Sequence, residues 1–243
     1  MQVPKIVWQT WKTREVPDKW KPSQQAIKIF CSDWEYVLTT DEDNRNFVIA
    51  RFPEYLALYD SFEKEIYRAD MIRYMYLYTY GGVYLDLDLQ LVKSLDDLLE
   101  YGDLFLVKTP NFGGYTNAFM ASAPGNVFWL RCLEEIERRS VNKPFYIQGD
   151  LKVLYTTGPS MITKVVSEYN RPFVTIPYKL GHPCSVCDTY DGVCEDEDSY
   201  VLELEGSSWS TSAKLMHFLY CRWKLILVII VLIILLYILF RYM

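Results

Sequence analysis

Segment 63–91 constrains the fold of this 243-residue chain more than any other part of it. Its first portion, 63–80, contains no proline or glycine, which is typical of a single helix. Gly81 and Gly82 follow, and glycine ends a helix at little cost because it can adopt left-handed backbone angles. The hydrophobic period then becomes about 2 residues, with Val83, Leu85, Leu87 and Leu89 alternating with Tyr84, Asp86, Asp88 and Gln90. The segment therefore predicts a helix followed by a strand that has one polar face.

The polar face of this strand carries two carboxylates, Asp86 and Asp88, with Cα atoms expected about 6.5–7 Å apart. Burying two ionised carboxylates in a sheet is costly, so these side chains should face solvent or a ligand. Together they can bind one hard divalent cation, which commonly takes further oxygens from a substrate diphosphate. A solvated acidic strand has the same pattern, so the spacing alone leaves both interpretations open.

The order of these motifs resembles glycosyltransferase family 32, whose domain carries an Asp-x-Asp sugar-binding motif. The chain has Arg-Ala-Asp at 68–70, Arg-Tyr at 73–74 and Gly-Gly-x-Tyr-x-Asp-x-Asp at 81–88, so every element of the family pattern is present. More distantly, the segment is similar to the glucosylating domain of large clostridial toxins. The resemblance implies an α/β fold of the GT-A type, a Rossmann-like nucleotide-sugar-binding domain with a mixed central sheet.

The resemblance also implies roles for the charged residues of these motifs. Asp70 and Arg73 would contact the donor sugar and its phosphates, and an ion pair between them on one helix is compatible with that role. Asp86 and Asp88 would hold Mn²⁺ or Mg²⁺ against the diphosphate of a nucleotide sugar. The predicted catalytic residues are therefore Asp70, Arg73, Asp86 and Asp88.

The rest of the donor and metal sites is predicted from the same resemblance. Glu205 and Ser208 would add oxygen ligands to the metal, although the histidine that many members have shortly before the final Trp is absent here. The predicted donor-binding residues are Trp8, Gln9, Asp70, Arg73, Tyr84, Asp86, Asn117, Gly158 and Trp209.

Two of these donor-binding residues have a structural alternative. Either Trp8 or Trp11 would pack on the base of the donor, but buried tryptophans are mostly packing residues, so both interpretations stay open. Asn117 could instead make a hydrogen bond to the backbone at the end of a strand.

Upstream of the motifs, apolar patterns predict strands in segments 6–11 and 34–39 and helices in segments 23–30 and 44–52. Strands that alternate with helices are typical of a doubly wound domain, where ligands bind at the carboxyl ends of the strands.

Cysteines near the C-terminus leave three interpretations open. Cys184 and Cys187, with Cys194 and the nearby His182, could hold a structural Zn²⁺ ion. A disulfide is the alternative in an oxidising lumen. Reduced thiols in a surface loop are the third possibility.

The chain ends in an unbroken apolar run at 225–240, which can just span a bilayer. We therefore predict a catalytic domain at 1–215 and a C-terminal membrane anchor at 216–243, with the transmembrane helix at about 224–240. Arg222 and Lys224 precede the run and Arg241 follows it, an excess that favours a cytosolic catalytic domain. A catalytic domain in the lumen of the secretory pathway is the alternative.

Together these features predict a membrane-anchored, metal-dependent, retaining glycosyltransferase. The resemblance favours transfer of mannose from GDP-mannose to a lipid or membrane-associated glycan such as inositol phosphoceramide. UDP-glucose or UDP-galactose as donor, with a glycan or protein acceptor, is one alternative. A non-catalytic membrane-anchored binding protein that kept the fold is another. The net charge of −6 argues against a nucleic-acid partner.

Overall fold

The computed structural model describes residues 2–100, 102–110, 113–142, 144–184, 187, 197–204, 206 and 213–242. Six strands form a central sheet: β1 (Ile6–Thr10), β2 (Glu35–Thr39), β3 (Gly82–Leu85), β5 (Leu104–Lys108), β6 (Tyr115–Ser122) and β7 (Val174–Ile176). Their order is β2-β1-β3-β6-β5-β7. β1 is parallel to β2 and β3, β6 is antiparallel to β3 and β5, and β7 is parallel to β5. The predicted mixed α/β sheet is therefore confirmed.

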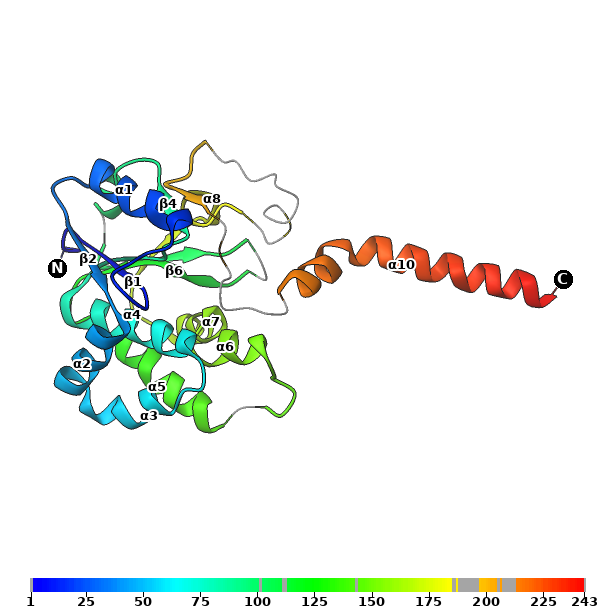
Figure 1. The fold of residues 1–243 in the computed structure, drawn as a ribbon, viewed down its shortest axis with the longest axis horizontal. Helices are drawn as coiled ribbons and strands as arrows, with labels where there is room; N and C mark the ends of the chain where they lie inside the picture. The colour runs from blue at the N-terminus through cyan, green and yellow to red at the C-terminus, as the bar shows by residue number, and fades with distance from the viewer. Residues whose placement is uncertain are drawn as a thin grey trace.

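Helices cover both faces of this sheet (Figure 1). One face carries α1 (Lys21–Phe30), α8 (Tyr178–Gly181) and a small sheet of β4 (Leu89–Leu91) and β8 (Val201–Glu203). The other carries α2 (Asp41–Arg51), α3 (Leu56–Ser61), α4 (Glu65–Tyr80), α5 (Val127–Val141), α6 (Asp150–Thr156) and α7 (Pro159–Glu168). Short 3₁₀ helices lie at Asp18–Trp20, Pro53–Tyr55 and Asp97–Leu99.

Each face of the sheet buries its own apolar layer, because successive strand side chains point to opposite faces. In β5, Leu104 and Leu106 join the layer that contains α4 and α5. Phe105 and Val107 join the layer that contains α1 and β4. The sheet is thus covered on both sides, as expected for a doubly wound domain.

The helix predicted from segment 63–80 is α4, and it ends at Tyr80. Gly81 and Gly82 have φ angles of 68° and 93°, in the region that favours glycine. Gly81 is also confined by its surroundings, since a Cβ there would lie 2.7 Å from the backbone nitrogen of Pro124. α4 therefore leads directly into β3, as the sequence predicts.

The strand after these glycines is shorter than predicted. β3 ends at Leu85, and the chain then turns through 86–88 before β4 begins at Leu89 in the second sheet. The N–H of Leu89 donates to the carbonyl of Asp86 at 3.1 Å, which closes this turn. The alternating pattern thus belongs to two strands joined by a turn, and that turn holds the Asp-x-Asp motif.

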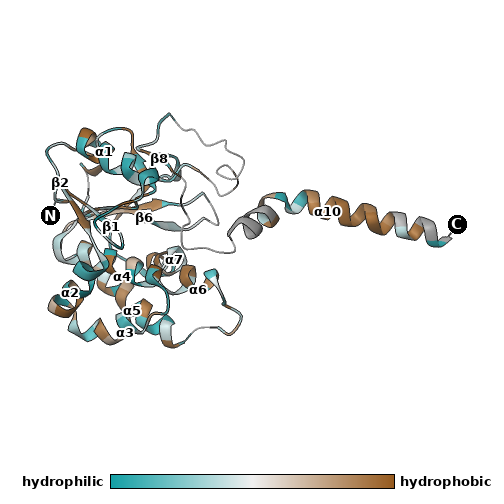
Figure 2. Cartoon of the chain, viewed as in Figure 1, coloured by the Kyte–Doolittle hydropathy of each residue, from teal (hydrophilic) through white to brown (hydrophobic). Residues whose placement is uncertain are grey.

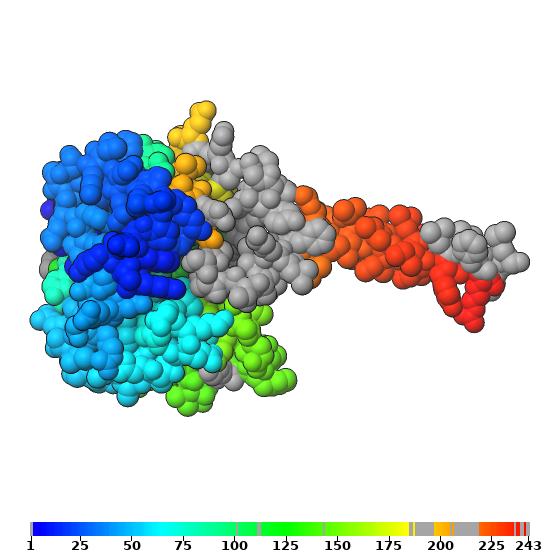
Figure 3. All heavy atoms as spheres, viewed as in Figure 1, coloured from blue at the N-terminus to red at the C-terminus, as the bar shows by residue number. Residues whose placement is uncertain are grey.

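At the C-terminus, α10 (Ala213–Tyr242) projects from the α/β body (Figures 1 and 3), and apolar residues cover much of it (Figure 2). Within the described part of the chain, no helix is both long enough and apolar enough to cross a membrane. The transmembrane helix predicted at about 224–240 is therefore not supported.

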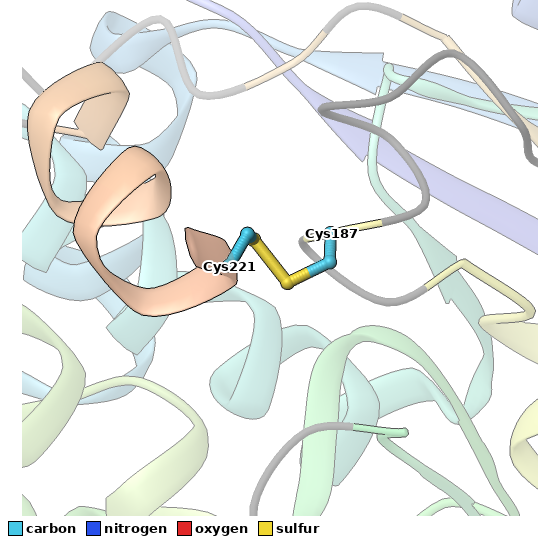
Figure 4. Close-up of a disulfide and its surroundings, with 2 residues drawn as sticks. All are labelled: Cys187 and Cys221. Atoms are coloured by element: carbon cyan, nitrogen blue, oxygen red, sulfur yellow. A yellow bond between two sulfur atoms is a disulfide. The ribbon is translucent and has the colours of Figure 1, made fainter. Parts of the chain in front are cut away.

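A disulfide joins α10 to the α/β body. Cys187 is bonded to Cys221 of α10, with their Cα atoms 5.4 Å apart (Figure 4). Cys184 is also disulfide-bonded, whereas Cys194 lies outside the described residues. A sulfur in a disulfide has no thiolate to offer a metal. The zinc site predicted at Cys184, Cys187 and Cys194 is therefore wrong, and the disulfide interpretation holds for the first two.

Candidate active site

Asp70 and Arg73 lie next to each other on the buried face of α4. Nη2 of Arg73 is 3.1 Å from Oδ1 of Asp70, so the ion pair that their three-residue spacing allows is present. The two residues are only 4% and 3% exposed. Buried charges are tolerated when they are paired and hydrogen-bonded, and both residues have further partners from other elements.

Arg73 also contacts Asp86 in the turn after β3. Nη1 of Arg73 lies 3.1 Å from Oδ1 of Asp86 and donates to the carbonyl of Asn117 at 2.7 Å. The ring of Tyr84 packs on the guanidinium, with 4.4 Å between the ring centroid and Cζ of Arg73. The Tyr84 hydroxyl donates to Oδ1 of Asp86 at 2.9 Å. Arg73 and Tyr84, both buried, thus hold the Asp86 carboxylate from two sides.

Asp70 is held by a second group of hydrogen bonds. Nδ2 of Asn117 donates to Oδ1 of Asp70 at 2.9 Å, and Oγ1 of Thr157 donates to Oδ2 at 2.7 Å. The Tyr74 hydroxyl donates to the carbonyl of Thr157 at 2.6 Å. Burial raises the pKa of Asp70 to about 6, although Arg73 and Thr157 lower it. The side-chain amide of Asn117 therefore positions the Asp70 carboxylate, in place of the alternative hydrogen bond to the backbone at the end of a strand.

Sequence analysis did not identify Tyr74 and Thr157 as parts of this network. Thr157 immediately precedes Gly158, which was predicted to bind the donor, and Tyr74 follows Arg73 in the Arg-Tyr element. Their position next to these motif residues was the sequence signal that could have identified Tyr74 and Thr157 as parts of the site.

Asp86 and Asp88 lie at the carboxyl end of β3, where ligands bind in sheets of this kind. The Asp86 side chain is 28% exposed. Burial, together with the negative charges of Asp86 and Glu203, raises the pKa of Asp88 to about 7. Carboxylates that disfavour each other's ionisation are stabilised by a cation between them. Their oxygens and mutual repulsion therefore fit a hard divalent metal.

Among the described residues, no cluster of three or more His, Cys, Asp or Glu side chains is arranged as a metal site. Asp86 and Asp88 supply fewer oxygens than a hard divalent cation takes, so a cation there would accept others from a substrate or from residues outside the described part. Diphosphates commonly supply them to Mg²⁺.

Gly206 lies against the Asp88 carboxylate. A Cβ at Gly206 would be 2.0 Å from Oδ2 of Asp88, and the N–H of Leu204 donates to the Asp88 carbonyl at 2.7 Å. β8 therefore brings the segment after Glu203 next to the Asp-x-Asp turn. Three predicted site residues lie outside the described part of the chain: Glu205, Ser208 and Trp209.

Residues 17–104, which include α4 and the Asp-x-Asp turn, match the family described as glycosyltransferase sugar-binding region containing DXD motif. This stretch of the chain therefore carries the sugar-binding region of that glycosyltransferase family. Its predicted resemblance is thereby confirmed for the segment that carries Asp70, Arg73, Asp86 and Asp88.

Relatives in the family are similar over a longer stretch. Inositol phosphoceramide mannosyltransferase 3 of Schizosaccharomyces pombe is 40% identical over 169 residues, covering 70% of this chain and 46% of the relative. Inositol phosphoceramide mannosyltransferase 2 of the same yeast is 36% identical over 212 residues, covering 85% of this chain and 58% of the relative. The chain thus spans about half the length of these relatives.

A solved structure supports the fold of this chain. The PaToxG glycosyltransferase superimposes with a TM-score of 0.52 at 16% identity, covering 68% of this chain and 69% of that one. The mixed sheet and this similarity together identify a GT-A-like α/β fold.

Two of the residues predicted to bind the donor are buried in this structure. Trp8 is in the core, 8% exposed, where its indole N–H donates to the Gly81 carbonyl at 2.8 Å. Its ring stacks on Tyr76 with 4.8 Å between centroids. The packing alternative therefore applies to Trp8. Gly158 is buried against α6, since a Cβ there would be 3.0 Å from the Leu154 Cα.

Gln9 supports the turn from β1. Its Nε2 atom donates to the Asp86 carbonyl at 3.4 Å and to Oγ of Ser23 at 3.0 Å. Its Oε1 atom accepts from the Tyr36 hydroxyl at 2.9 Å. Gln9 is 1% exposed, so its role in this structure is to position the backbone of the Asp-x-Asp turn.

His182 lies near the same carboxylates. Its Nδ1 atom is 2.5 Å from Oε1 of Glu203. Burial opposes protonation of His182, but the hydrogen bond with Glu203 and the charges of Glu203 and Asp88 raise its pKa above the ordinary value. Sequence analysis considered His182 only as a zinc ligand.

A cavity of about 400 Å³ opens beside this site, at the carboxyl end of β1. Its lining residues are Thr10, Trp11, Lys12, Asp41, Glu63, Lys64, Glu65, Ile66 and Ala69. Of the two tryptophans considered for the donor base, Trp11 lines this cavity. The cavity has polar and apolar walls, as sites for small organic ligands do.

Proposed function

We propose that this chain transfers mannose from GDP-mannose to a lipid or membrane-associated glycan acceptor such as inositol phosphoceramide. The names of the two yeast relatives support both the sugar and the acceptor. The observation that carries the proposal is the contact of Arg73 with both Asp70 and Asp86 at the carboxyl end of β3. A nucleotide diphosphate placed there would meet the Asp-x-Asp carboxylates.

Asp86 and Asp88 would hold the Mn²⁺ or Mg²⁺ ion of this transferase. A divalent cation supplies charge neutralisation to a leaving diphosphate. Arg73 orients the Asp86 carboxylate and adds positive charge behind it. Asp70, Asn117 and Thr157 in turn fix the guanidinium. Transfer with retention of anomeric configuration is part of the proposal.

We further propose that the catalytic domain folds in an oxidising compartment, in place of the cytosolic location favoured by the basic residues before α10. The disulfide between Cys187 and Cys221 supports this, because disulfides persist in secretory and extracellular environments and are rare in the cytosol. The secretory lumen was the alternative left open by the sequence.

A donor panel tests the proposed reaction. The full chain is incubated with GDP-mannose, UDP-glucose or UDP-galactose and with inositol phosphoceramide in detergent micelles, with Mn²⁺ or with EDTA. Released nucleotide and the mass of the lipid product are measured. We expect mannosylated lipid from GDP-mannose only in the presence of metal, none from Asp88→Asn, and normal product from Asp97→Asn, an exposed control.

Other outcomes select the alternatives. Turnover of UDP-glucose or UDP-galactose, without turnover of GDP-mannose, would show that the donor is a UDP-sugar. Metal-independent turnover would remove the metal from the proposal. Absence of turnover with every donor, with the protein folded, would favour a non-catalytic binding protein.

A further inference from the structure

The cavity at the end of β1 contains a carboxylate, Asp41, that the site described above does not use. Asp41 is the first residue of α2. Its position is fixed by a capping box, in which Oγ1 of Thr40 accepts from the Asp43 N–H at 3.2 Å and Oδ2 of Asp43 accepts from the Thr40 N–H at 2.8 Å. The Asp41 carboxylate therefore stands on a rigid helix start at the cavity wall.

Asp41 differs from the other acids that line the cavity. Glu63 is paired with Lys152, and Glu65 with Arg68 at 2.6 Å. For the Asp41 side chain, no hydrogen bond or ion pair is found among the described residues. Burial, and then the charge of Glu65, raises the pKa of Asp41 above its ordinary value. A partly desolvated carboxylate without a donor is suited to accept hydrogen bonds from a ligand.

The cavity adjoins the place where a diphosphate would meet the Asp-x-Asp turn. Thr10, in its wall, follows Gln9, whose amide contacts the Asp86 backbone. Ala69, which also lines the cavity, precedes Asp70, and its backbone carbonyl accepts a hydrogen bond from Nε of Arg73 at 3.1 Å. A nucleoside attached to that diphosphate can therefore enter the cavity and reach Asp41.

We propose that Asp41 selects guanine by accepting hydrogen bonds from N1–H and the 2-amino group of the base. This inference rests on the proposed function and specifies its donor. The two carboxylate oxygens match the two parallel donors of guanine, and bidentate pairing to an ionised acceptor is strong and directional. Lys12, in the same wall, is a donor for the guanine O6 acceptor.

Uracil fits the same wall poorly. It has one N–H donor between two carbonyl oxygens, so one oxygen of Asp41 would face a carbonyl oxygen. That arrangement leaves one oxygen of the Asp41 carboxylate without a hydrogen-bond donor and adds repulsion between the two oxygens. A site that leaves a polar group unpaired with the wrong ligand discriminates against that ligand. Asp41 therefore disfavours uridine nucleotides as it favours guanine.

Binding of nucleotides to the full chain, measured by calorimetry with Mn²⁺ present, tests this inference. Inosine diphosphate lacks only the 2-amino group, so we expect it to bind about tenfold or more weakly than GDP, because one hydrogen bond to a charged acceptor is lost. UDP should bind more weakly than GDP as well. Equal affinity for GDP and inosine diphosphate, or tighter binding of UDP, would overturn the assignment of Asp41 while leaving the glycosyltransferase proposal intact.

The Asp41→Asn variant makes the test independent of folding. Its amide can accept from N1–H but offers a donor where guanine has another donor, so GDP affinity should fall about tenfold or more. Xanthosine diphosphate has a carbonyl oxygen at that position and should bind Asp41→Asn more tightly than GDP does. Glu42→Gln is the matched control, since it removes the same charge from the same helix turn at an exposed position outside the cavity.

Each result of the variant series decides the inference. Reversed preference for xanthosine diphosphate in Asp41→Asn, with the control unchanged, supports it. Unchanged GDP affinity in Asp41→Asn, or the same loss in Glu42→Gln, contradicts it. Absence of binding by every nucleoside diphosphate to the wild-type protein would remove both this inference and the proposed function.

Discussion

Nη1 of Arg73 lies 3.1 Å from Oδ1 of Asp86, although α4 carries the first residue and the turn after β3 carries the second. Gly81 and Gly82 make this contact possible, because they reverse the chain between the helix and the strand within two residues. The charged residues of one continuous motif are thereby brought together at the carboxyl end of β3.

The ion pairs of Arg73 predict a large effect on stability. Arg73→Ala would leave Asp70 buried without its counter-charge, and removing one partner of a buried pair costs about 3–5 kcal/mol. We expect the free energy of unfolding, measured in urea, to fall by about that amount. Arg45→Ala breaks the exposed pair with Asp60 and should change stability little. Equal effects of the two substitutions would argue against a tightly buried network.

The raised pKa of Asp88 predicts that metal binding depends on pH. Metal requires the ionised carboxylate, so protons compete with Mn²⁺ below the pKa of about 7. We expect Mn²⁺ affinity, measured by calorimetry, to be constant above pH 8 and to fall up to about tenfold per pH unit below pH 7. Asp88→Asn should bind Mn²⁺ weakly, with a much smaller dependence on pH in this range.

The same shift predicts the pH dependence of stability without metal. The pKa of an unfolded Asp is about 3.9, so the folded protein binds the Asp88 proton more tightly than the unfolded chain does. Its contribution to the free energy of unfolding is therefore full below about pH 4 and is lost as the pH rises to about 7. Comparing wild type with Asp88→Asn in urea isolates this contribution. A wild-type contribution that grows over that pH range would contradict the sign.

The contact of Gly206 with Asp88 predicts a local effect. A Cβ at Gly206 would displace the Asp88 carboxylate, since the two would be 2.0 Å apart. Gly206→Ala should therefore lower Mn²⁺ affinity about tenfold or more, while the urea midpoint changes little because only the end of a side chain must move. A large loss of stability would indicate that the backbone, and not the carboxylate, is displaced.

The disulfide predicts the result of peptide mapping. Digestion of the protein without reduction should yield a linked pair of peptides that contain Cys187 and Cys221. Cys31 and Cys132 are free and buried, so they should react with iodoacetamide only after unfolding. Recovery of Cys187 and Cys221 as separate alkylated peptides from natively expressed protein would exclude the bond and the compartment proposed from it.

The sequence by itself determined the local structure of the site segment and its family. The change from helical to alternating period around Gly81 located α4 and β3. The three-residue spacing of Asp70 and Arg73 placed both residues on the same side of α4, where they can form an ion pair. These features follow from backbone geometry within a few residues, which sequence periodicity records directly.

Only the tertiary structure decided how distant residues complete the site. It placed Trp8 in the core and Trp11 at the cavity, brought Thr157 to Asp70, and joined Cys187 to Cys221. It also divided the alternating segment into two strands, so that Asp86 and Asp88 lie in a turn. Each of these outcomes depends on packing between elements far apart in the chain, and residue spacing does not encode which distant surfaces meet or which face of a strand becomes the core.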